Sequence, residues 1–221
     1  MSGFLKNSLN IEFKLGMYDS ILLIVRKSCE LMVESCLTNK HNLYNHEEKI
    51  RNHLLENYLN NDHIRSQIGM ENIQLRFLSE VPEHYDSESD TYLGRIDIKV
   101  VSNNWFSNCL DYYIIECKRV DGTKKLNQKY ITEGVCRFVG DSPLYPSYNN
   151  MNLMLAFIVK DVDKTKMLKD ISYEHKEKLE KETINSIIIT EKTSSWFLCE
   201  SKYKNNLLLK HLFYDISSII A

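Results

Sequence analysis

The first third of the chain carries apolar residues at helical spacing, with polar and charged residues between them. This pattern predicts three helices, over residues 17–38, 45–59 and 62–67. Asn45 is a residue type that favours the N-cap, and Glu47 and Glu48 follow it in the expected first turn, where acidic side chains complement the helix dipole. Helices are therefore expected before any strand.

After residue 72 the period of the pattern changes from helical to alternating. Strands are expected over residues 73–78, 92–101 and 111–120, and their close succession suggests an antiparallel meander. Between the first two strands lies an acidic stretch, which contains Glu80, Glu83, Asp86, Glu88 and Asp90. We expect this stretch to be a solvated loop, because water accommodates so many like charges best.

Helical and strand patterns alternate again in the second half of the chain. A helix is expected over residues 124–139, and residues 153–159 are apolar throughout, as in a strand that is covered on both faces. A highly charged helix is expected over residues 164–181, followed by strands over 184–190, 195–201 and 207–214. The pattern thus predicts an α/β fold.

The length of 221 residues suits one α/β domain with a full core. With 3 prolines, 7 glycines and no stretch rich in Ser, Gly or Pro, the chain offers no obvious flexible linker. We therefore expect a single domain, made of an N-terminal helical part (1–44), a core (45–160) and a C-terminal elaboration (161–221).

The cysteines and the apolar runs bear on the cellular compartment. The six cysteines are scattered and include no C-x-x-C pair, which argues against a zinc ribbon or a disulfide framework and favours reduced thiols. The most apolar early run, residues 21–25, is too short to span a bilayer, and Arg26 and Lys27 follow it. The expectation is a cytoplasmic protein without membrane association.

An acid and a base stand close together in the strand expected over residues 111–120. Strand alternation places Glu116 and Lys118 on one face and Cys117 on the other. Burying both ions in so apolar a strand costs several kcal/mol per ion unless a cation and a partner compensate, so the arrangement suggests a function rather than packing. Asp97, on the neighbouring strand, would supply a second carboxylate for a hard cation such as Mg²⁺.

Residues 94–97 (Gly-Arg-Ile-Asp) and 116–118 (Glu-Cys-Lys) together resemble the motif of the PD-(D/E)xK nuclease superfamily. The literal proline of that motif is missing. The order of elements over about residues 45–160 supports the resemblance, because Asp97 falls on the second of three expected strands and Glu116 on the third. The resemblance implies a restriction-endonuclease-like αβββαβ core, with a mixed central sheet flanked by helices, to which a C-terminal helix and strands are added.

The same resemblance implies a site for Mg²⁺ or Mn²⁺. Asp97 and Glu116 would bind the cation, and Lys118 would position or activate the attacking water. Cys117, whose side chain is expected to face away, would offer the metal only its backbone carbonyl.

A glutamate on the first core helix often completes the metal site in this family. Glu47 shares an inward-facing stripe with Ile50 and Leu54, whereas Glu48 aligns with Leu55. We therefore expect Glu47 to be the additional catalytic and metal-binding residue. The alternative, that both glutamates only complement the helix dipole, stays open.

Local charge rather than global charge points to a nucleic-acid partner. The net charge is −2, but a basic strip follows the strand that contains Lys118. The candidates for contacts with a nucleic-acid backbone are Lys124, Lys125, Lys129 and Arg137, with ordinary solvation as the alternative for the lysines. Tyr130 lies on the same helical stripe as Arg137, and packing explains it better.

Together with these residues, the resemblance implies a metal-dependent nuclease that hydrolyses phosphodiester bonds, with DNA as the expected substrate and RNA as the alternative. The resemblance implies a role in restriction or phage defence, and action as a homodimer or with a partner protein. Two other interpretations stay open. In the first, Glu116 and Lys118 form only a structural salt bridge. In the second, the chain is a non-catalytic module that keeps the nuclease fold and binds nucleic acid or protein.

Overall fold

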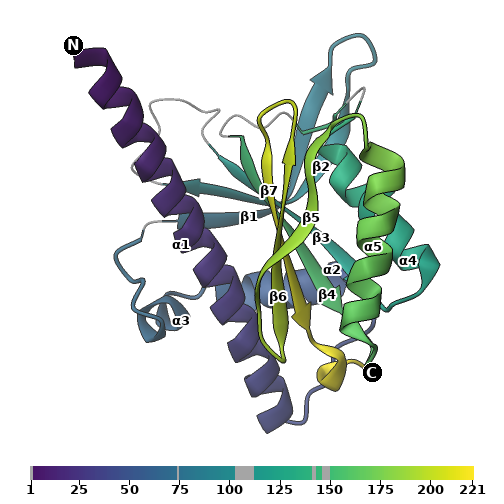
Figure 1. The fold of residues 1–221 in the computed structure, drawn as a ribbon. Coiled ribbons are helices and arrows are strands. Elements are labelled where there is room, and N and C mark those ends of the chain that lie inside the picture. Colours follow the sequence, from purple (N-terminus) through teal and green to yellow (C-terminus); the bar gives the residue numbers. More distant parts are fainter. Residues whose placement is uncertain (1, 74, 103–111, 141–142, 146–149) are drawn as a thin grey trace.

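The structure is a computed structural model that describes residues 2–73, 75–102, 112–140, 143–145 and 150–221, with only the backbone for 2–11 and 13 (Figure 1). The described strands form one seven-stranded sheet in the order β1-β2-β3-β4-β7-β6-β5. Their bounds are β1 Leu75–Asp86, β2 Thr91–Ser102, β3 Tyr113–Val120, β4 Met151–Ile158, β5 Thr183–Lys192, β6 Trp196–Tyr203 and β7 Leu208–Asp215.

Parallel and antiparallel pairing occupy different parts of the sheet. β1, β2 and β3 form an antiparallel meander, β3, β4 and β7 run parallel, and β7, β6 and β5 are again antiparallel. The α/β architecture with a mixed sheet is therefore confirmed. The C-terminal strands continue the same sheet beyond β4.

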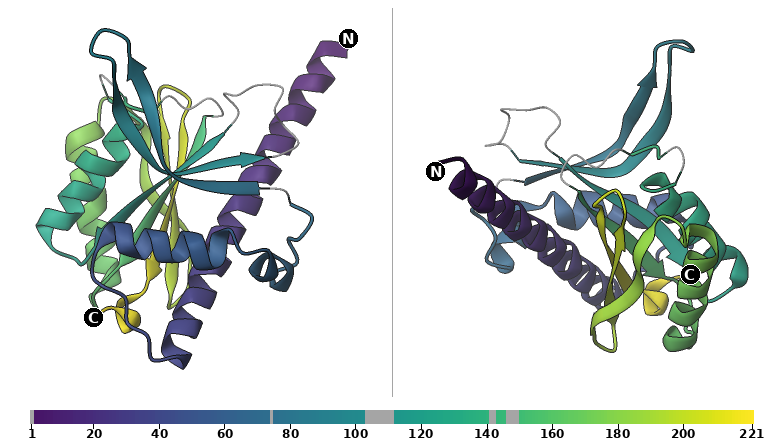
Figure 2. Two further views of the ribbon diagram at one scale, coloured as in Figure 1. Left: turned by 180° about the vertical axis from the view of Figure 1, so that it is seen from behind. Right: turned by 45° about the horizontal axis from the view of Figure 1, so that its top comes forward.

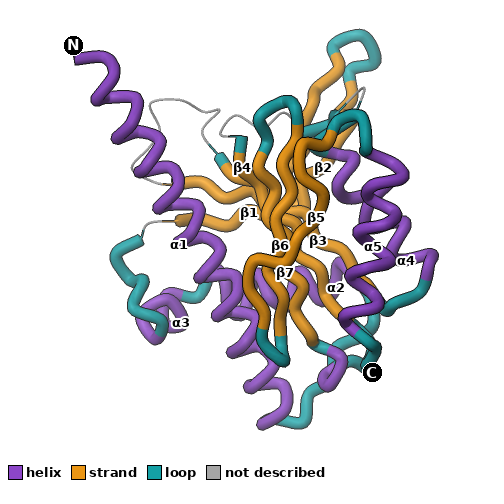
Figure 3. The backbone as a smooth tube through the Cα atoms, viewed as in Figure 1, coloured by secondary structure: helices purple, strands orange, loops and turns teal. Residues whose placement is uncertain are grey.

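Helices cover both faces of the sheet (Figures 2 and 3). The helical segments are α1 Ser2–Thr38, α2 Glu47–Leu54, α3 Asp62–Gln67, α4 Lys124–Lys129 and α5 Lys164–Leu179, with π-helical turns η1 Leu55–Leu59 and η2 Tyr130–Gly134 and 3₁₀ turns η3 Val135–Arg137 and η4 Ser217–Ile219. Buried residues of α1, α2 and η1 share one core, whereas those of η2, η3 and α5 share the other. The sheet separates these two hydrophobic layers.

β4 contributes to both layers, because all of its residues are buried. Leu153 and Leu155 contact the core beneath α1 and α2, while Met154 and Ala156 contact the core beneath α5. This alternation confirms the expectation of a strand covered on both faces.

α1 is longer than the amphipathic pattern of residues 17–38 indicated. It begins at Ser2, and its N-terminal part extends beyond the sheet (Figure 1). Between Tyr18 and Cys36 its inward-facing side chains are buried against the sheet. Among the helices that the structure describes, none combines the length and the hydrophobicity needed to cross a membrane.

The acidic stretch expected to be a solvated loop is largely a strand pair. β1 and β2 stay in register as far as Asp86 and Thr91. Glu80, near the middle of β1, lies 2.7 Å from Arg51 through Oε1 and 3.5 Å from Arg95 through Oε2. The expectation was wrong because cations from other elements neutralise part of this charge, which a local pattern does not reveal.

Two helix boundaries also differ from expectation. The N-cap of α2 is His46 rather than Asn45, whose side-chain oxygen instead accepts a hydrogen bond from Arg119 at 2.6 Å. The helix expected over residues 124–139 is divided into α4, η2 and η3 and ends at Arg137. Residues 74 and 111, which fall within two of the expected strands, lie outside the described residues.

Candidate functional site

The candidate site lies where β2 and β3 separate. Among the described residues, the two strands pair where Ile98–Val100 of β2 face Tyr113–Ile115 of β3. Beyond this point β2 continues with β1 as a hairpin, whereas β3 continues beside β4 as far as Val120. The hairpin therefore rises away from the rest of the sheet (Figure 2), and the edge of β3 that faces it loses its strand partner.

Two carboxylates replace the missing strand partner of β3. The backbone N–H of Cys117 donates to Asp97 Oδ2 at 2.8 Å, and the N–H of Arg119 donates to Glu47 Oε2 at 3.0 Å. Buried backbone donors must be satisfied, so these bonds stabilise the opened strand. They also bring a carboxylate from β2 and a carboxylate from α2 to the same point of the chain.

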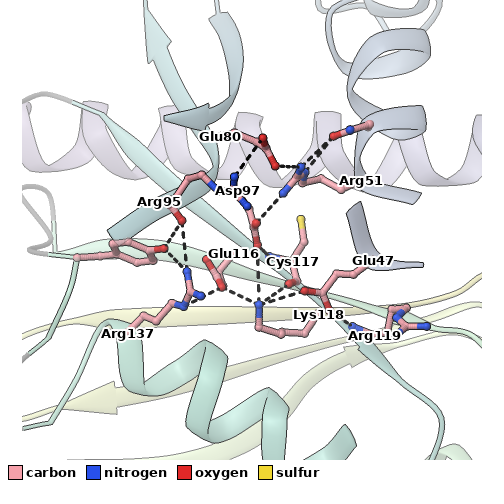
Figure 4. Close-up of polar contacts among 12 residues, drawn as sticks. Glu47, Arg51, Glu80, Arg95, Asp97, Glu116, Cys117, Lys118, Arg119 and Arg137 are labelled. Atoms are coloured by element: carbon pink, nitrogen blue, oxygen red, sulfur yellow. Dashed lines mark hydrogen bonds and ion pairs between the residues drawn. The ribbon is translucent and has the colours of Figure 1, made fainter. Parts of the chain in front are cut away.

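The ammonium group of Lys118 lies among the oxygens of this cluster (Figure 4). Its Nζ atom is 2.7 Å from Glu116 Oε1, 2.9 Å from the carbonyl oxygen of Cys117, 3.3 Å from Glu47 Oε1 and 3.9 Å from Asp97 Oδ2. The structure therefore brings together Asp97, Glu116, Lys118 and Glu47, as the sequence predicted.

Glu116 is the most deeply buried carboxylate of the cluster, with a side chain that is 0% exposed. Burial and the negative charge of Asp97 raise the pKa of Glu116 to about 8, although Lys118 and Arg137 act in the opposite direction. Its Oε2 atom has no hydrogen-bond partner. Burial by itself would lower the pKa of Lys118, but the surrounding carboxylates, Glu116 foremost, outweigh it and raise that pKa.

Arg51 of α2 holds the far side of Asp97 and was not predicted from the sequence. Its Nη1 atom is 2.7 Å from Asp97 Oδ1, and its Nη2 atom is 2.7 Å from Glu80 Oε1. The Arg51 side chain is only 4% exposed, so this guanidinium positions Asp97 rather than contacting solvent. The sequence feature that could have identified Arg51 is its spacing, because it follows Glu47 by one helical turn on the same face of the helix.

Arg137 of η3 lies against Glu116 on the other side of the cluster. Its Nε atom is 3.3 Å from Glu116 Oε1, and its Nη1 atom donates to the carbonyl oxygen of Arg95 at 3.3 Å and to the Tyr145 hydroxyl. Its side chain is 30% exposed and borders the cavity described below. Contact with a nucleic-acid backbone stays a prediction for this residue.

Gly134 allows η2 to pack closely on Lys118. A Cβ atom at this position would lie 2.6 Å from Met154 Cε and 3.3 Å from Lys118 Cγ. The neighbouring Tyr130 is fully buried, and its hydroxyl lies 2.8 Å from Nδ1 of His211. The packing interpretation of Tyr130 is confirmed.

A cavity of about 660 Å³ opens above the cluster. Lys125 and Lys129 border it, whereas Lys124 borders a different cavity, beside α5. Lys129 also pairs with Glu133 at 3.0 Å. Glu48, the alternative to Glu47, is exposed and also borders the cavity.

The oxygens of the cluster suit a hard divalent cation. Mg²⁺ typically takes one or two carboxylates and completes its octahedron with water. Asp97 and Glu116 offer two carboxylates, and Oε2 of Glu116 is buried without a partner.

The Cys117 carbonyl faces Lys118 Nζ, and the Cys117 side chain points into the core beneath α1 and α2, as predicted. In the described part of the chain, no group of three or more His, Cys, Asp or Glu side chains is arranged to hold a metal ion.

The site therefore combines buried acids, an interior lysine and a polar cavity with basic residues on its rim. No protein-family model, curated protein or solved structure matches this chain.

Proposed function

We propose that the protein is a metal-dependent nuclease that hydrolyses phosphodiester bonds, with DNA as its substrate. The observation that carries the proposal is the convergence of Asp97, Glu116 and Lys118 at the separation of β2 and β3, beneath a cavity with basic residues on its rim. The resemblance of the two sequence segments to the PD-(D/E)xK superfamily supports the same reaction.

In this proposal Asp97 and Glu116 would hold Mg²⁺ or Mn²⁺, with the Cys117 carbonyl and Glu47 as further candidate ligands. Such a cation supplies Lewis-acid stabilisation of the phosphoryl group and lowers the pKa of a bound water. Arg51 keeps Asp97 oriented through the 2.7 Å contact between Nη1 and Oδ1. Asp97 is thereby positioned before substrate arrives.

Lys118 has a separate role in the proposed reaction. Its ammonium is held at 2.7 Å from Glu116 and is 8% exposed at the floor of the cavity. From there it orients the attacking water and offsets negative charge that develops on the phosphoryl group. Glu47, half-buried and 3.3 Å from Lys118, helps to keep the ammonium in place.

One observation favours a second function, that of a non-catalytic module that binds nucleic acid or protein. The Lys118 ammonium lies among the very oxygens that would bind a cation, and it neutralises them without a metal. In that interpretation Lys118 is a permanent structural substitute for the cation. The two functions differ in whether the site takes up a divalent ion and cleaves.

Cleavage assays with Mg²⁺, Mn²⁺ or chelator test the proposal directly. The purified chain is incubated with linear, circular and single-stranded DNA and with RNA. We expect cleavage that needs the metal and is abolished by Glu116→Gln, which keeps the shape of the buried side chain. Glu191→Gln, at an exposed position of β5, is the matched control and should cleave normally.

Calorimetric titration with Mn²⁺ separates the two functions. Binding by the wild type that is lost in Glu116→Gln supports the nuclease. A folded wild type that neither binds Mn²⁺ nor cleaves any of these substrates rejects it in favour of the binding module.

A further inference from the structure

The β1–β2 hairpin forms one wall of the cavity above the cluster. Tyr92 and Leu93 border this cavity, although they are 57% and 52% exposed. The hairpin stands free of the rest of the sheet (Figure 2). Large apolar side chains at the mouth of a polar site are available to a ligand rather than used in the core.

Tyr92 belongs to an aromatic pair that is held in place without being buried. Tyr85 lies directly opposite it in the β1–β2 register, and the ring centroids are 5.2 Å apart in an edge-to-face arrangement. The Tyr85 hydroxyl donates to Asp90, which orients the Tyr85 ring. A fixed and exposed ring is a platform on which a planar group can stack.

Basic side chains from another part of the chain also border the cavity, together with Glu133, which pairs with Lys129. Lys125 and Lys129 of α4 border it, with Arg137 deeper towards Glu116. Cations at this place suit the phosphates of a nucleic-acid strand whose scissile bond lies over the cluster. The cavity is therefore bordered by exposed aromatic and apolar side chains from the hairpin and by basic side chains from α4.

The charge of the hairpin argues against phosphates on its side. From Glu80 to Leu93 it contains five acidic residues and no lysine or arginine. Arg95 of β2 also borders the cavity, but its guanidinium lies 3.5 Å from Glu80, which offsets its charge. A duplex presents phosphates along both of its strands, so the hairpin would repel one of them. A single strand can turn its bases towards the tyrosines and its phosphates towards α4.

We infer that the site takes single-stranded nucleic acid, with a base stacked on Tyr92 and the backbone phosphates at Lys125 and Lys129. This inference rests on the proposed function, whose substrate class it names. Stacking on aromatic side chains and a basic groove for the backbone are the usual means by which proteins bind single strands.

Binding measured in chelator tests the inference without any cleavage. Fluorescence anisotropy compares single-stranded DNA and RNA with duplex of the same sequence. We expect tighter binding of a single strand, weakened about tenfold or more in Tyr92→Ala and retained in Tyr92→Phe, because the ring supplies the stacking. Tyr173→Ala is the matched control, because Tyr173 is similarly exposed, at 63%, but lies on α5.

The outcomes separate this inference from the proposed function. Equal affinity for single strand and duplex, or an unchanged affinity in Tyr92→Ala, overturns the inference, even if the wild type cleaves duplex DNA with Mg²⁺. Preferential single-strand binding that depends on Tyr92 supports it, even if the chain cleaves nothing and the nuclease proposal fails.

Discussion

Lys118 neutralises several carboxylates at once, and this determines what its removal does. Its ammonium contacts Glu116 and Glu47 directly and lies 3.9 Å from Asp97. Without it, three acids would face one another in a partly buried space, where like charges repel strongly. A divalent cation would relieve that repulsion.

Lys118→Met therefore separates catalysis from metal binding. It keeps the apolar stem and removes the charge, so we expect Mn²⁺ to bind as tightly as in the wild type or more tightly, while single-turnover cleavage falls by about a hundredfold or more. Thermal unfolding should show a lower Tm in chelator that Mn²⁺ restores. Lys166→Met, on the exposed face of α5, is the control. Loss of Mn²⁺ binding in Lys118→Met would contradict these roles.

Cys117 lies between two residues of the candidate site, but its side chain packs in the hydrophobic core and has no proposed role in catalysis. Its side chain is 0% exposed and lies in the layer beneath α1 and α2. Cys117→Ala should lower the free energy of unfolding by about 1 kcal/mol through lost packing, while the folded protein cleaves at the wild-type rate. Denaturant unfolding and a cleavage assay check both parts. A stable but inactive variant would show that the side chain takes part in the chemistry.

Residue positions that depend on local geometry were predictable from the sequence. Strand alternation placed Glu116 and Lys118 on one face and Cys117 on the other, because it follows from the pleat of the backbone alone. Arg51 and Glu80 were missed. Their roles depend on which elements meet in space, and the sequence pattern does not contain that information.

At the scale of elements, the division of one expected helix into three pieces is the clearest departure from local pattern. Apolar spacing over residues 124–139 fits a continuous helix, yet π-helical geometry begins at Tyr130 and a 3₁₀ turn at Val135. The contact of Gly134 with Met154 and Lys118 accompanies this change. Packing against β3 and β4 thus overrides the local helical preference, which is why the sequence could not predict it.

Gly134→Ala tests whether the close approach of η2 matters for the site. The added Cβ would lie 2.6 Å from Met154 Cε and 3.3 Å from Lys118 Cγ, so we expect a loss of stability of about 1–3 kcal/mol and slower cleavage as Lys118 shifts. Gly16→Ala is the matched control. Apart from its chain neighbours and the backbone of its own helix, nothing lies within 4 Å of its Cβ position in α1, so Gly16→Ala should stabilise the protein by about 0.5–1 kcal/mol. Equal effects of the two substitutions would show that the close packing at Gly134 is unimportant.

At the scale of the whole molecule, a buried polar network joins the site side of the sheet to its C-terminal strands. Tyr130 Oη and Ser201 Oγ each lie 2.8 Å from a ring nitrogen of His211. Ser201 donates to Tyr203 at 2.9 Å, and the Tyr203 hydroxyl lies 2.8 Å from His175 Nε2. The strand character of these segments was predictable from the sequence. Their order in the sheet, with β7 beside β4, was not, because it depends on long-range contacts such as these.

The two buried histidines make stability depend on pH. Burial lowers the pKa of His175 from 6.5 to about 4, and burial together with the charge of His175 lowers the pKa of His211 further. Below pH 6.5 the unfolded chain binds protons on these histidines that the folded chain does not, so their contribution to stability is full above that value and falls as the pH drops towards 4. Glu116 contributes a slope of the opposite sign, because its pKa is raised from 4.5 to about 8 in the folded protein. The expected slope is up to about 1.4 kcal/mol per pH unit for each histidine. Denaturant unfolding between pH 7.5 and 4.5 measures it.

Substituting one histidine provides the internal comparison. In His175→Gln the slope between pH 6.5 and 4 should be smaller than in the wild type, although the variant is less stable at pH 7.5 because its ring contacts are lost. An unchanged slope would mean that His175 does not remain neutral in the folded protein.

The carboxylates that replace the strand partner of β3 have a consequence for self-association. An unpaired strand edge in the middle of a sheet is a template on which a strand from another molecule can add, and inward-pointing charges are a common means of preventing this. Asp97 and Glu47 occupy the backbone donors of Cys117 and Arg119 that such a strand would use. The acids proposed for catalysis thus also prevent a strand of another molecule from pairing with this edge of β3. The double variant Asp97→Ala/Glu47→Ala should therefore aggregate through this edge.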